Sequence, residues 1–314
     1  MAGRRLKRLI PGHFADLCES KNIKTVQDLI ELPDLDIIDA LDISVGDLAS
    51  ALRKIYSKLA PKPRTAFNML DAEISSLTFE SSKVRIEPGI ITEIVGAAGV
   101  GKSQWCTTLS AMAHLPTEYG GLGGGVVYVD TESSFSPSRL VEIARSRYPK
   151  FYDVKALKKL TQNIQVFQCS HARELVDRIT QLDATIIEKQ IKMIIVDSMA
   201  SPFRSDFDSK HIPERQMMLS IAASKLKYLG ETYRIPIVVT NQVSGGTKKN
   251  LADDEEHLTA ALGITWAHAV NVRYRLQKKP GKNSMECLVS KSPCSARLSF
   301  QYSIANEGLI FSEQ

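Results

Sequence analysis

Residues 96–103 read Gly-Ala-Ala-Gly-Val-Gly-Lys-Ser, a G-x-x-x-x-G-K-S spacing that constrains this chain more than any other feature. The glycines let the backbone turn tightly with its N–H groups pointing inward, which forms a cradle for nucleotide phosphates. Lys102 supplies a positive charge for the β- and γ-phosphates, and the Ser103 hydroxyl is suited to hold Mg²⁺. The motif therefore predicts a nucleotide site built by Gly96, Ala97, Ala98, Gly99, Val100, Gly101, Lys102, Ser103 and Gln104.

Such a cradle needs a strand before it and a helix after it, because the helix N-terminus adds partial positive charge at the phosphates. Residues 90–95 are rich in β-branched side chains and follow a Pro-Gly turn. Residues 104–115 carry apolar side chains at helical spacing. Both flanks favour the nucleotide interpretation over its alternative, an ordinary glycine turn between core elements.

The chain has 314 residues, 43% of them hydrophobic, which is enough for a full α/β core and one small extra domain. Apolar positions in the first 60 residues predict several short helices, so we expect a helical N-terminal domain over 1–60. Pro61 and Pro63 then prevent helix continuation. We place a linker over 61–80 and an ATPase-type core over 81–314.

Composition limits the partners and the cellular compartment that we expect for the protein. The net charge of +5 permits a nucleic-acid partner without requiring one. Five scattered cysteines with no C-x-x-C pair predict free thiols in a reducing compartment. No apolar run is long enough for a membrane span and no signal peptide is evident, so we expect a soluble intracellular protein without a membrane partner.

Four β-rich runs follow the linker, at 126–129, 164–167, 193–196 and 235–239, and helical segments alternate with them. Such alternation predicts parallel βαβ units, that is, a mostly parallel twisted sheet flanked by helices. From about residue 263 the helical pattern stops. Strand-like runs then continue to residue 311, which predicts antiparallel strands that extend the sheet.

Polar side chains end three of these runs, and the carboxyl ends of parallel strands meet at one edge of a sheet. Asp197 ends an apolar strand and is the expected metal partner beside Ser103. Glu132 is the candidate base for an attacking water, its alternative being a helix N-cap. Gln242 is a candidate sensor of the γ-phosphate, because a neutral amide both donates and accepts.

Four segments in this order, GAAGVGKSQ, VVYVDTESSF, IIVDS and IPIVVTNQV, resemble the RecA/RadA-type strand-exchange recombinases of archaea and eukaryotes. The resemblance covers nearly the whole chain and implies a P-loop NTPase core of the RecA-like type. Residues 114–133, HLPTEYGGLGGGVVYVDTES, and 139–149, RLVEIARSRYP, are most similar to the eukaryotic recombinase paralogues of the B type.

This resemblance implies ATP and Mg²⁺ as cofactors and a weak ATPase that depends on DNA and on partners. It assigns Lys102, Glu132 and Gln242 to catalysis, and Ser103 and Asp197 to the metal. It implies a nuclear protein in a heteromer with other recombinase paralogues, especially the C paralogue. The complex would help load the main recombinase on single-stranded DNA in homologous recombination and double-strand break repair.

The family also implies two DNA-contacting loops, whose counterparts here are 204–210 and 243–262. Basic side chains in them are candidates for phosphate contacts, namely Arg204, Lys210, Lys248 and Lys249. Aromatic side chains for base stacking are nearly absent, with Phe203 and Phe207 the nearest. The acidic run at 253–256 argues against tight DNA binding by the second loop.

Two positions depart from the family pattern. Filament-forming members carry a Phe-x-x-Ala anchor in the linker, where this chain has Pro63-Arg64-Thr65-Ala66, so we expect no long homofilaments. Lys291 stands where those members have an aspartate near a neighbouring subunit's nucleotide. It is a candidate for a contact in trans to that nucleotide, the alternative being a surface lysine.

Two other functions stay open at this stage. The first is a scaffold subunit that binds ATP without hydrolysing it, so that the nucleotide only stabilises an interface. The second is a P-loop phosphotransferase acting on small molecules. Such enzymes need lid arginines around the phosphates, and the sequence after the P-loop helix has no arginine-rich lid segment.

Overall fold

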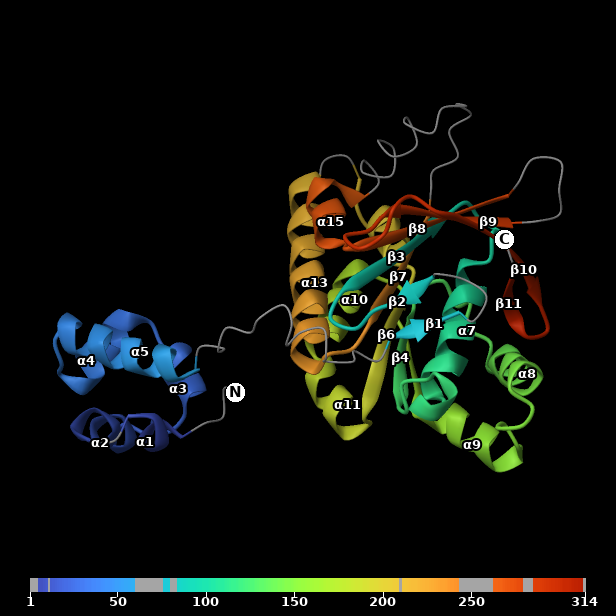
Figure 1. Ribbon diagram of the computed structural model, residues 1–314. Helices are drawn as coiled ribbons and strands as arrows, with labels where there is room; N and C mark the ends of the chain where they lie inside the picture. Colours follow the sequence, from blue (N-terminus) through green and yellow to red (C-terminus); the bar gives the residue numbers. More distant parts are fainter. Residues whose placement is uncertain are drawn as a thin grey trace. The chain divides into compact units, whose positions relative to one another are not determined.

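The computed structural model describes residues 5–10, 12–59, 76–79, 84–208, 211–242, 262–278 and 285–312. It divides the chain into two compact units, Met1–Glu73 and Ile74–Gln314 (Figure 1). In the described residues no helix has the length and apolar character needed to cross a membrane. All five cysteines are free thiols, as predicted, and Cys294 is the exposed one.

The first unit is helical, as predicted. Its helices are α1 Leu6–Leu9, α2 His13–Ser20, α3 Val26–Ile30, α4 Asp34–Leu41 and α5 Val45–Leu59. A capping box starts α3, because the Asp28 backbone N–H donates to Thr25 Oγ1 at 3.2 Å and the Thr25 N–H donates to Asp28 Oδ2 at 2.9 Å. Helices this short are unstable alone, so the unit depends on its shared apolar core, which includes Leu6, Leu29 and Ile55.

The second unit contains a nine-stranded sheet in the order β11-β10-β9-β8-β3-β7-β6-β4-β5. From β5 to β8 every neighbouring pair is parallel, and β9, β10 and β11 continue antiparallel. This confirms the predicted RecA-like fold with its mostly parallel sheet. The strands are β3 Ile91–Gly96, β4 Gly125–Asp130, β5 Ile164–Gln168, β6 Ile191–Asp197, β7 Ile237–Gln242, β8 Val272–Lys278, β9 Met285–Lys291, β10 Ser299–Ala305 and β11 Gly308–Phe311.

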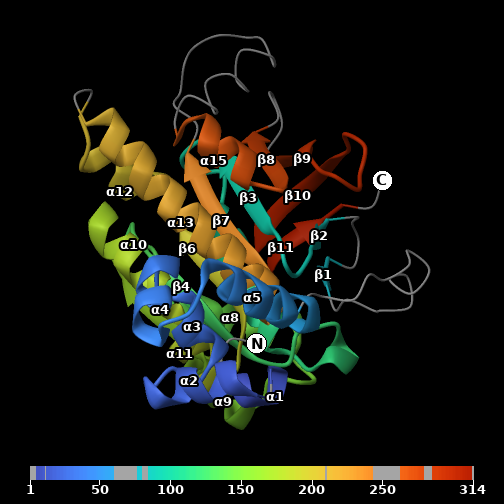
Figure 2. The ribbon, with the colours of Figure 1, turned by 90° about the vertical axis from the view of Figure 1, so that its left-hand side faces the viewer.

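Helices cover both faces of this sheet, so its central strands are buried on both sides and consist mostly of apolar residues. One layer holds α7 Lys102–His114, α8 Pro137–Arg147 and α9 Val154–Asn163, and a short 3₁₀ turn, η1, spans Thr117–Tyr119 (Figure 1). Figure 2 shows α13 crossing the other face with α10 beside it. That layer comprises α10 Ala172–Thr180, α11 Leu182–Glu188, α12 Ala200–Ser205, α13 Ile212–Tyr233 and α15 Ile264–Ala269.

A small hairpin of β1 Leu77–Thr78 and β2 Arg85–Ile86 packs into the layer of α7. Leu77 and Phe79 are fully buried there. The segment expected as a linker over 61–80 therefore reaches the core before residue 80, because the alternation of Leu77, Thr78 and Phe79 buries one face of a strand. The stretch 63–66, where the family anchor is missing, lies outside the described residues.

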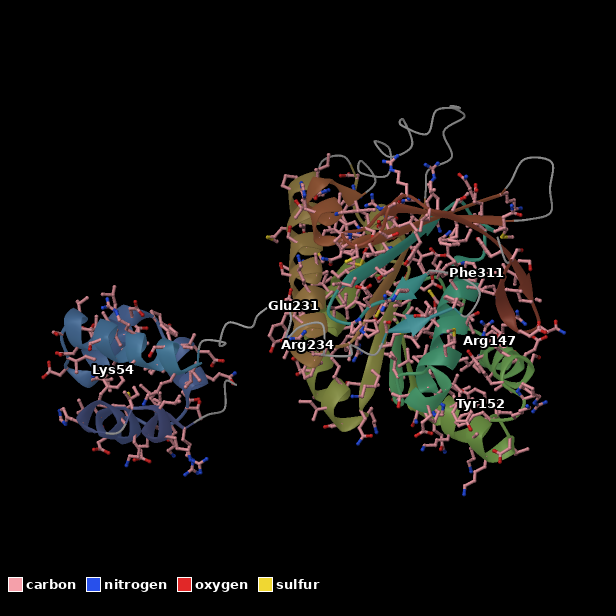
Figure 3. All side chains as sticks on the ribbon, viewed as in Figure 1. Lys54, Arg147, Tyr152, Glu231, Arg234 and Phe311 are labelled. Carbon is pink, nitrogen blue, oxygen red and sulfur yellow. The ribbon has the colours of Figure 1, made fainter. Side chains whose placement is uncertain are left out.

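Trp105 packs helix α7 against the strands at the C-terminal side of the sheet. Its buried ring stacks on Tyr274 with centroids 6.1 Å apart, and meets Phe79, Tyr302 and Phe311 edge-on at 5.5, 5.8 and 5.6 Å. Arg147, which is labelled in Figure 3, extends the cluster. Its guanidinium lies over the Phe79 ring. The helix that leaves the glycine-rich loop is thus fixed by aromatic packing.

Candidate nucleotide site

The predicted phosphate cradle lies between β3 and α7, at the carboxyl end of a central strand. Gly99 and Gly101 have φ of +78° and +90°, a left-handed conformation that glycine adopts without strain. A Cβ atom on Gly96 would lie 2.6 Å from the Leu276 carbonyl oxygen, so a side chain cannot fit there. The glycines are therefore required by the backbone, and the turn has the geometry of an anion-binding loop.

The C-terminal strands support this loop directly. The Tyr302 hydroxyl on β10 donates to the Val100 carbonyl at 2.8 Å. Arg139 on α8 donates to Gln104 Oε1 at 2.9 Å and also to the Ala305 carbonyl. Arg139 was not predicted as a site residue, and it joins the start of α7 to the end of β10. One wall of the cradle thus comes from the last quarter of the chain.

Lys102 is almost entirely buried, and its ammonium group donates to the Gly96 and Ala97 carbonyls, both at 3.0 Å. Burial lowers the pKa of Lys102, and the negative charges of Glu132 and Asp197 act in the opposite direction. The ammonium is thus held beside the loop, where phosphate oxygens would stabilise its charge. Lys102 fits the phosphate-binding role that the motif predicts.

Binding of Mg-ATP is expected to take up protons at pH values around and above the lowered pKa of Lys102. Burial lowers the pKa of Lys102 in the free protein, whereas phosphate oxygens would raise it in the complex, so the fraction of Lys102 that is a neutral amine takes up a proton on binding. Affinity should consequently decline as the pH rises above the lowered pKa of the free protein. Calorimetry in two buffers of different ionisation enthalpy measures this uptake. The Lys102→Arg variant should show none, because its guanidinium stays charged, and equal uptake in both proteins would contradict the assignment.

Three oxygen-bearing side chains form a line from the loop to β6. Ser103 Oγ lies 3.3 Å from Ser134 Oγ, and the Ser134 hydroxyl donates to Asp197 Oδ2 at 3.2 Å. The buried Asp197 also accepts from the Tyr128 hydroxyl at 2.8 Å and from Thr240 Oγ1 at 2.5 Å. Oxygen ligands suit Mg²⁺, so the set fits the metal expected of Ser103 and Asp197.

Glu132, which follows β4, lies beside Gln242 at the end of β7. Its Oε1 accepts from the Gln242 side-chain amide at 2.9 Å and from the Ser198 hydroxyl at 2.7 Å. The N-cap of α8, the alternative considered for Glu132, is instead Ser136, which accepts from the Arg139 backbone N–H. The candidate sensor is therefore hydrogen-bonded directly to a carboxylate oxygen of the candidate base.

Asp130 at the end of β4 holds the loop that carries these groups. Its Oδ1 accepts from the backbone N–H groups of Glu132 and Ser134 at 3.2 and 3.1 Å, and its Oδ2 accepts from that of Phe135 at 3.0 Å. The sequence analysis missed Ser134, Ser198 and the role of Asp130. The only available signal was the polar run after the strand.

The described residues of the first predicted DNA loop have partners within the chain. Arg204, at the exposed end of α12, donates to the Gln242 carbonyl at 2.6 Å. Phe203 is buried, so its ring packs in the core rather than facing a base, and the half-buried Phe207 stacks on it with centroids 6.1 Å apart. Lys210, Lys248 and Lys249 lie outside the described residues, and DNA contacts by the basic set stay a prediction.

Lys291 ends β9, where its ammonium donates to the Ala267 carbonyl at 2.9 Å and to the Val270 carbonyl at 2.6 Å. It therefore satisfies the C-terminal carbonyls of α15. Burial, with a smaller effect of Arg273, lowers the pKa of Lys291. It pairs in register with Arg273, whereas the glycine-rich loop begins at Gly96 opposite Leu276. Within its own chain Lys291 therefore does not lie at the edge of the sheet that carries the glycine-rich loop. Its contact with the nucleotide of a neighbouring subunit stays a prediction.

Comparisons with known proteins agree with this geometry. A family model described as Rad51 matches residues 78–312. The protein called DNA repair protein RAD51 homolog 2 is 35% identical in Homo sapiens, covering 100% of this chain and 90% of the human one. Its counterpart in Arabidopsis thaliana is 30% identical, covering 94% of this chain and 87% of that one. DNA repair protein RAD51 of Saccharomyces cerevisiae is 29% identical, covering 91% of this chain and 72% of the yeast protein.

The family match runs from β1 to just past β11, and the full-length relatives extend the likeness across the first unit as well. The resemblance that the four sequence segments indicated is thereby confirmed. The chain belongs to the Rad51 family.

Proposed function

We propose that this protein is an ATP-binding subunit and weak, DNA-dependent ATPase of a complex of recombinase paralogues. The complex would help load the main recombinase on single-stranded DNA in the nucleus, in homologous recombination and double-strand break repair. The names of the similar relatives support a role in DNA repair. The missing Phe-x-x-Ala anchor favours a mixed complex over a homofilament, with other paralogues, especially the C paralogue, as partners.

One observation carries the proposal, namely the convergence of two groups of side chains at one edge of the sheet. Ser103, Ser134 and Asp197 form the metal group, and Glu132 with Gln242 forms the hydrolytic group. Bound in the cradle, Mg-ATP would supply the γ-phosphoryl group that is cleaved.

Each side chain then has a distinct task. Glu132 orients a water and accepts its proton at Oε1, and Lys102 offsets negative charge beside the loop. Gln242 can exchange its bond to Glu132 for one to a phosphate oxygen, because its amide donates in either case. That exchange would report the state of the nucleotide to the end of β7.

A second candidate is the ATP-bound scaffold, and one observation favours it. Glu132 Oε1 already accepts hydrogen bonds from Ser198 and Gln242. These two hydrogen bonds occupy the acceptor sites of that oxygen, which leaves it less free to take the proton of a water. In this reading the nucleotide stabilises the complex by linkage and stays intact. For the phosphotransferase we find no supporting contact within the described part of the chain.

The two candidates are separated by purifying the full-length chain with the partners that accompany it from cells. Nucleotide content and phosphate release are then measured with and without single-stranded DNA. Phosphate release that rises on DNA addition supports the ATPase. Bound ATP that survives purification without release supports the scaffold. A protein that binds no nucleotide in either setting would contradict both.

A further inference from the structure

Glu93 places a carboxylate in the middle of the central strand β3, and no step described above uses it. Its side chain is fully buried, between strands whose other inward positions are mostly apolar. Burying a carboxylate is costly unless charged and hydrogen-bonding partners surround it. The identity of those partners is therefore informative.

The partners of Glu93 come from three different elements. The Arg273 guanidinium on β8 donates to Glu93 Oε2 at 2.5 Å. Glu93 Oε1 accepts from the Asn241 amide on β7 at 3.0 Å and from the Trp266 indole N–H on α15 at 2.8 Å. One carboxylate thus joins both neighbouring strands and a helix.

On the β7 side, the network reaches the hydrolytic group in two contacts. Asn241 donates to Glu93 through its amide nitrogen, and its amide oxygen accepts from the Gln242 backbone N–H at 2.8 Å. The Gln242 side chain then donates to Glu132 at 2.9 Å. Because one amide plane makes both contacts of Asn241, a displacement of the Gln242 backbone at the end of β7 would change the hydrogen bond to Glu93.

On the other side, Glu93 holds the helix α15. Trp266 is buried on this helix, and the next turn ends at carbonyls that accept from the Lys291 ammonium. Lys291 is also the second cation near Glu93, since its positive charge interacts with that carboxylate. Helix α15 is therefore fixed at two points, by Glu93 through the indole and by Lys291 through its last carbonyls.

We propose that Glu93 is a positioning residue that couples α15 to Gln242 and thus to the nucleotide site. When Gln242 moves from Glu132 to a γ-phosphate, Asn241 and Glu93 transmit the change to Trp266, and a displacement of α15 acts on Gln242 in return. The coupling is reciprocal, as binding linkage requires. This inference rests on the proposed nucleotide binding and deepens it, because it names the residue that connects the sensor to the rest of the fold.

The two tryptophans of the chain allow a direct test. Trp105 lies on α7 directly after the cradle, and Trp266 lies on α15. The full-length protein is labelled with 5-fluorotryptophan and its two fluorine resonances are followed by NMR, the Trp266→Phe variant assigning them. Calorimetry measures binding of ADP and of a non-hydrolysable ATP analogue, each with Mg²⁺, in parallel.

In the wild type the Trp266 resonance should shift with the ATP analogue and much less with ADP, because only the former offers a γ-phosphate to Gln242. In Glu93→Gln the analogue should bind within about threefold of wild-type affinity, while most of the Trp266 shift is lost, because the direct hydrogen-bond path is broken. A merely structural role would change the melting temperature and leave the nucleotide-dependent shift of Trp266 in place.

Two further variants keep the test decisive. Asn241→Ala cuts the path but leaves the Glu93–Arg273 ion pair, so it should also lose the Trp266 shift even where Glu93→Gln fails to fold. Glu286→Gln on β9 is the matched control, because its carboxylate bonds to Gln277 at 2.7 Å, outside the network, and it should keep the shift.

Failure of the coupling and failure of the proposed nucleotide binding give different results. If the analogue binds and the Trp266 resonance does not respond, or responds equally in Asn241→Ala and the wild type, the coupling by Glu93 is wrong and the nucleotide site stands. If calorimetry detects no nucleotide binding by the wild type, the proposed function fails, and the coupling fails with it.

Discussion

Replacement of Glu132 by glutamine is expected to lower ATP turnover by about 100- to 10,000-fold, the range for loss of a positioned general base. The amide keeps the shape of the side chain and can still bond to Ser198, but it cannot accept the proton of the attacking water. Affinity for Mg-ATP should stay within about threefold of the wild-type value, because Lys102 and the cradle are unchanged. Phosphate release by the assembled complex and calorimetric titration give the two quantities.

Glu188→Gln is the matched control for this change. It alters an exposed carboxylate at the end of α11, away from the cradle, and should leave turnover unaffected. Turnover of Glu132→Gln above about a tenth of the wild-type rate would show that another group activates the water, since a lost general base costs at least about 100-fold. Reduced turnover together with lost assembly would instead assign Glu132 to the interface of the complex.

Truncation of Trp105 to alanine is expected to reduce the free energy of unfolding of the second unit by about 3–5 kcal/mol. The ring is buried among Phe79, Tyr274, Tyr302 and Phe311, so its removal leaves a cavity between α7 and the antiparallel strands. The measurement is urea denaturation of the full-length chain followed by circular dichroism. Because two units unfold, the transition that carries the sheet signal is fitted separately.

One control variant tests whether the effect depends on the volume lost at Trp105, and another tests whether it depends on the location of the ring. Trp105→Phe keeps an aromatic ring in the same cavity and should cost less than the alanine variant. Tyr119→Ala removes a ring that is 57% exposed and contacts one other ring, Phe151, so it should lower the free energy of unfolding by only about 0.5–1.5 kcal/mol. An alanine variant at Trp105 that loses less than about 1 kcal/mol would mean that the surrounding rings close the cavity.

The fold and the main site groups follow from local sequence rules. The glycine spacing around Lys102 defines a loop between a strand and a helix, and apolar runs define the parallel strands. Because parallel strands end at one edge, the placement of Glu132 and Gln242 at the same edge of the sheet could be predicted, whereas their direct contact could not, since β6 lies between β4 and β7. The contacts in the structure agree with that reasoning, while the catalytic role of each residue stays a prediction.

What escaped prediction depends on contacts between elements that are distant in sequence. Ser134 stands out from neighbouring serines only because the loop held by Asp130 brings it between Ser103 and Asp197. Glu93 did give a signal, as a charged residue inside an apolar strand, but its partners could be identified only after β7, β8 and α15 were assembled around it. Leu77, Thr78 and Phe79 also showed strand alternation, which the linker assignment overlooked.

The support that β10 gives to the phosphate loop has a consequence for shortened forms of this chain. The hydroxyl of Tyr302 and the carbonyl of Ala305 hold Val100 and Arg139, respectively, more than 150 residues after the loop they stabilise. A transcript or protease product that ends before residue 299 keeps every recognisable nucleotide motif and yet lacks one wall of the cradle. For this protein, intact motifs in a truncated product are therefore not a sufficient criterion for a working nucleotide site.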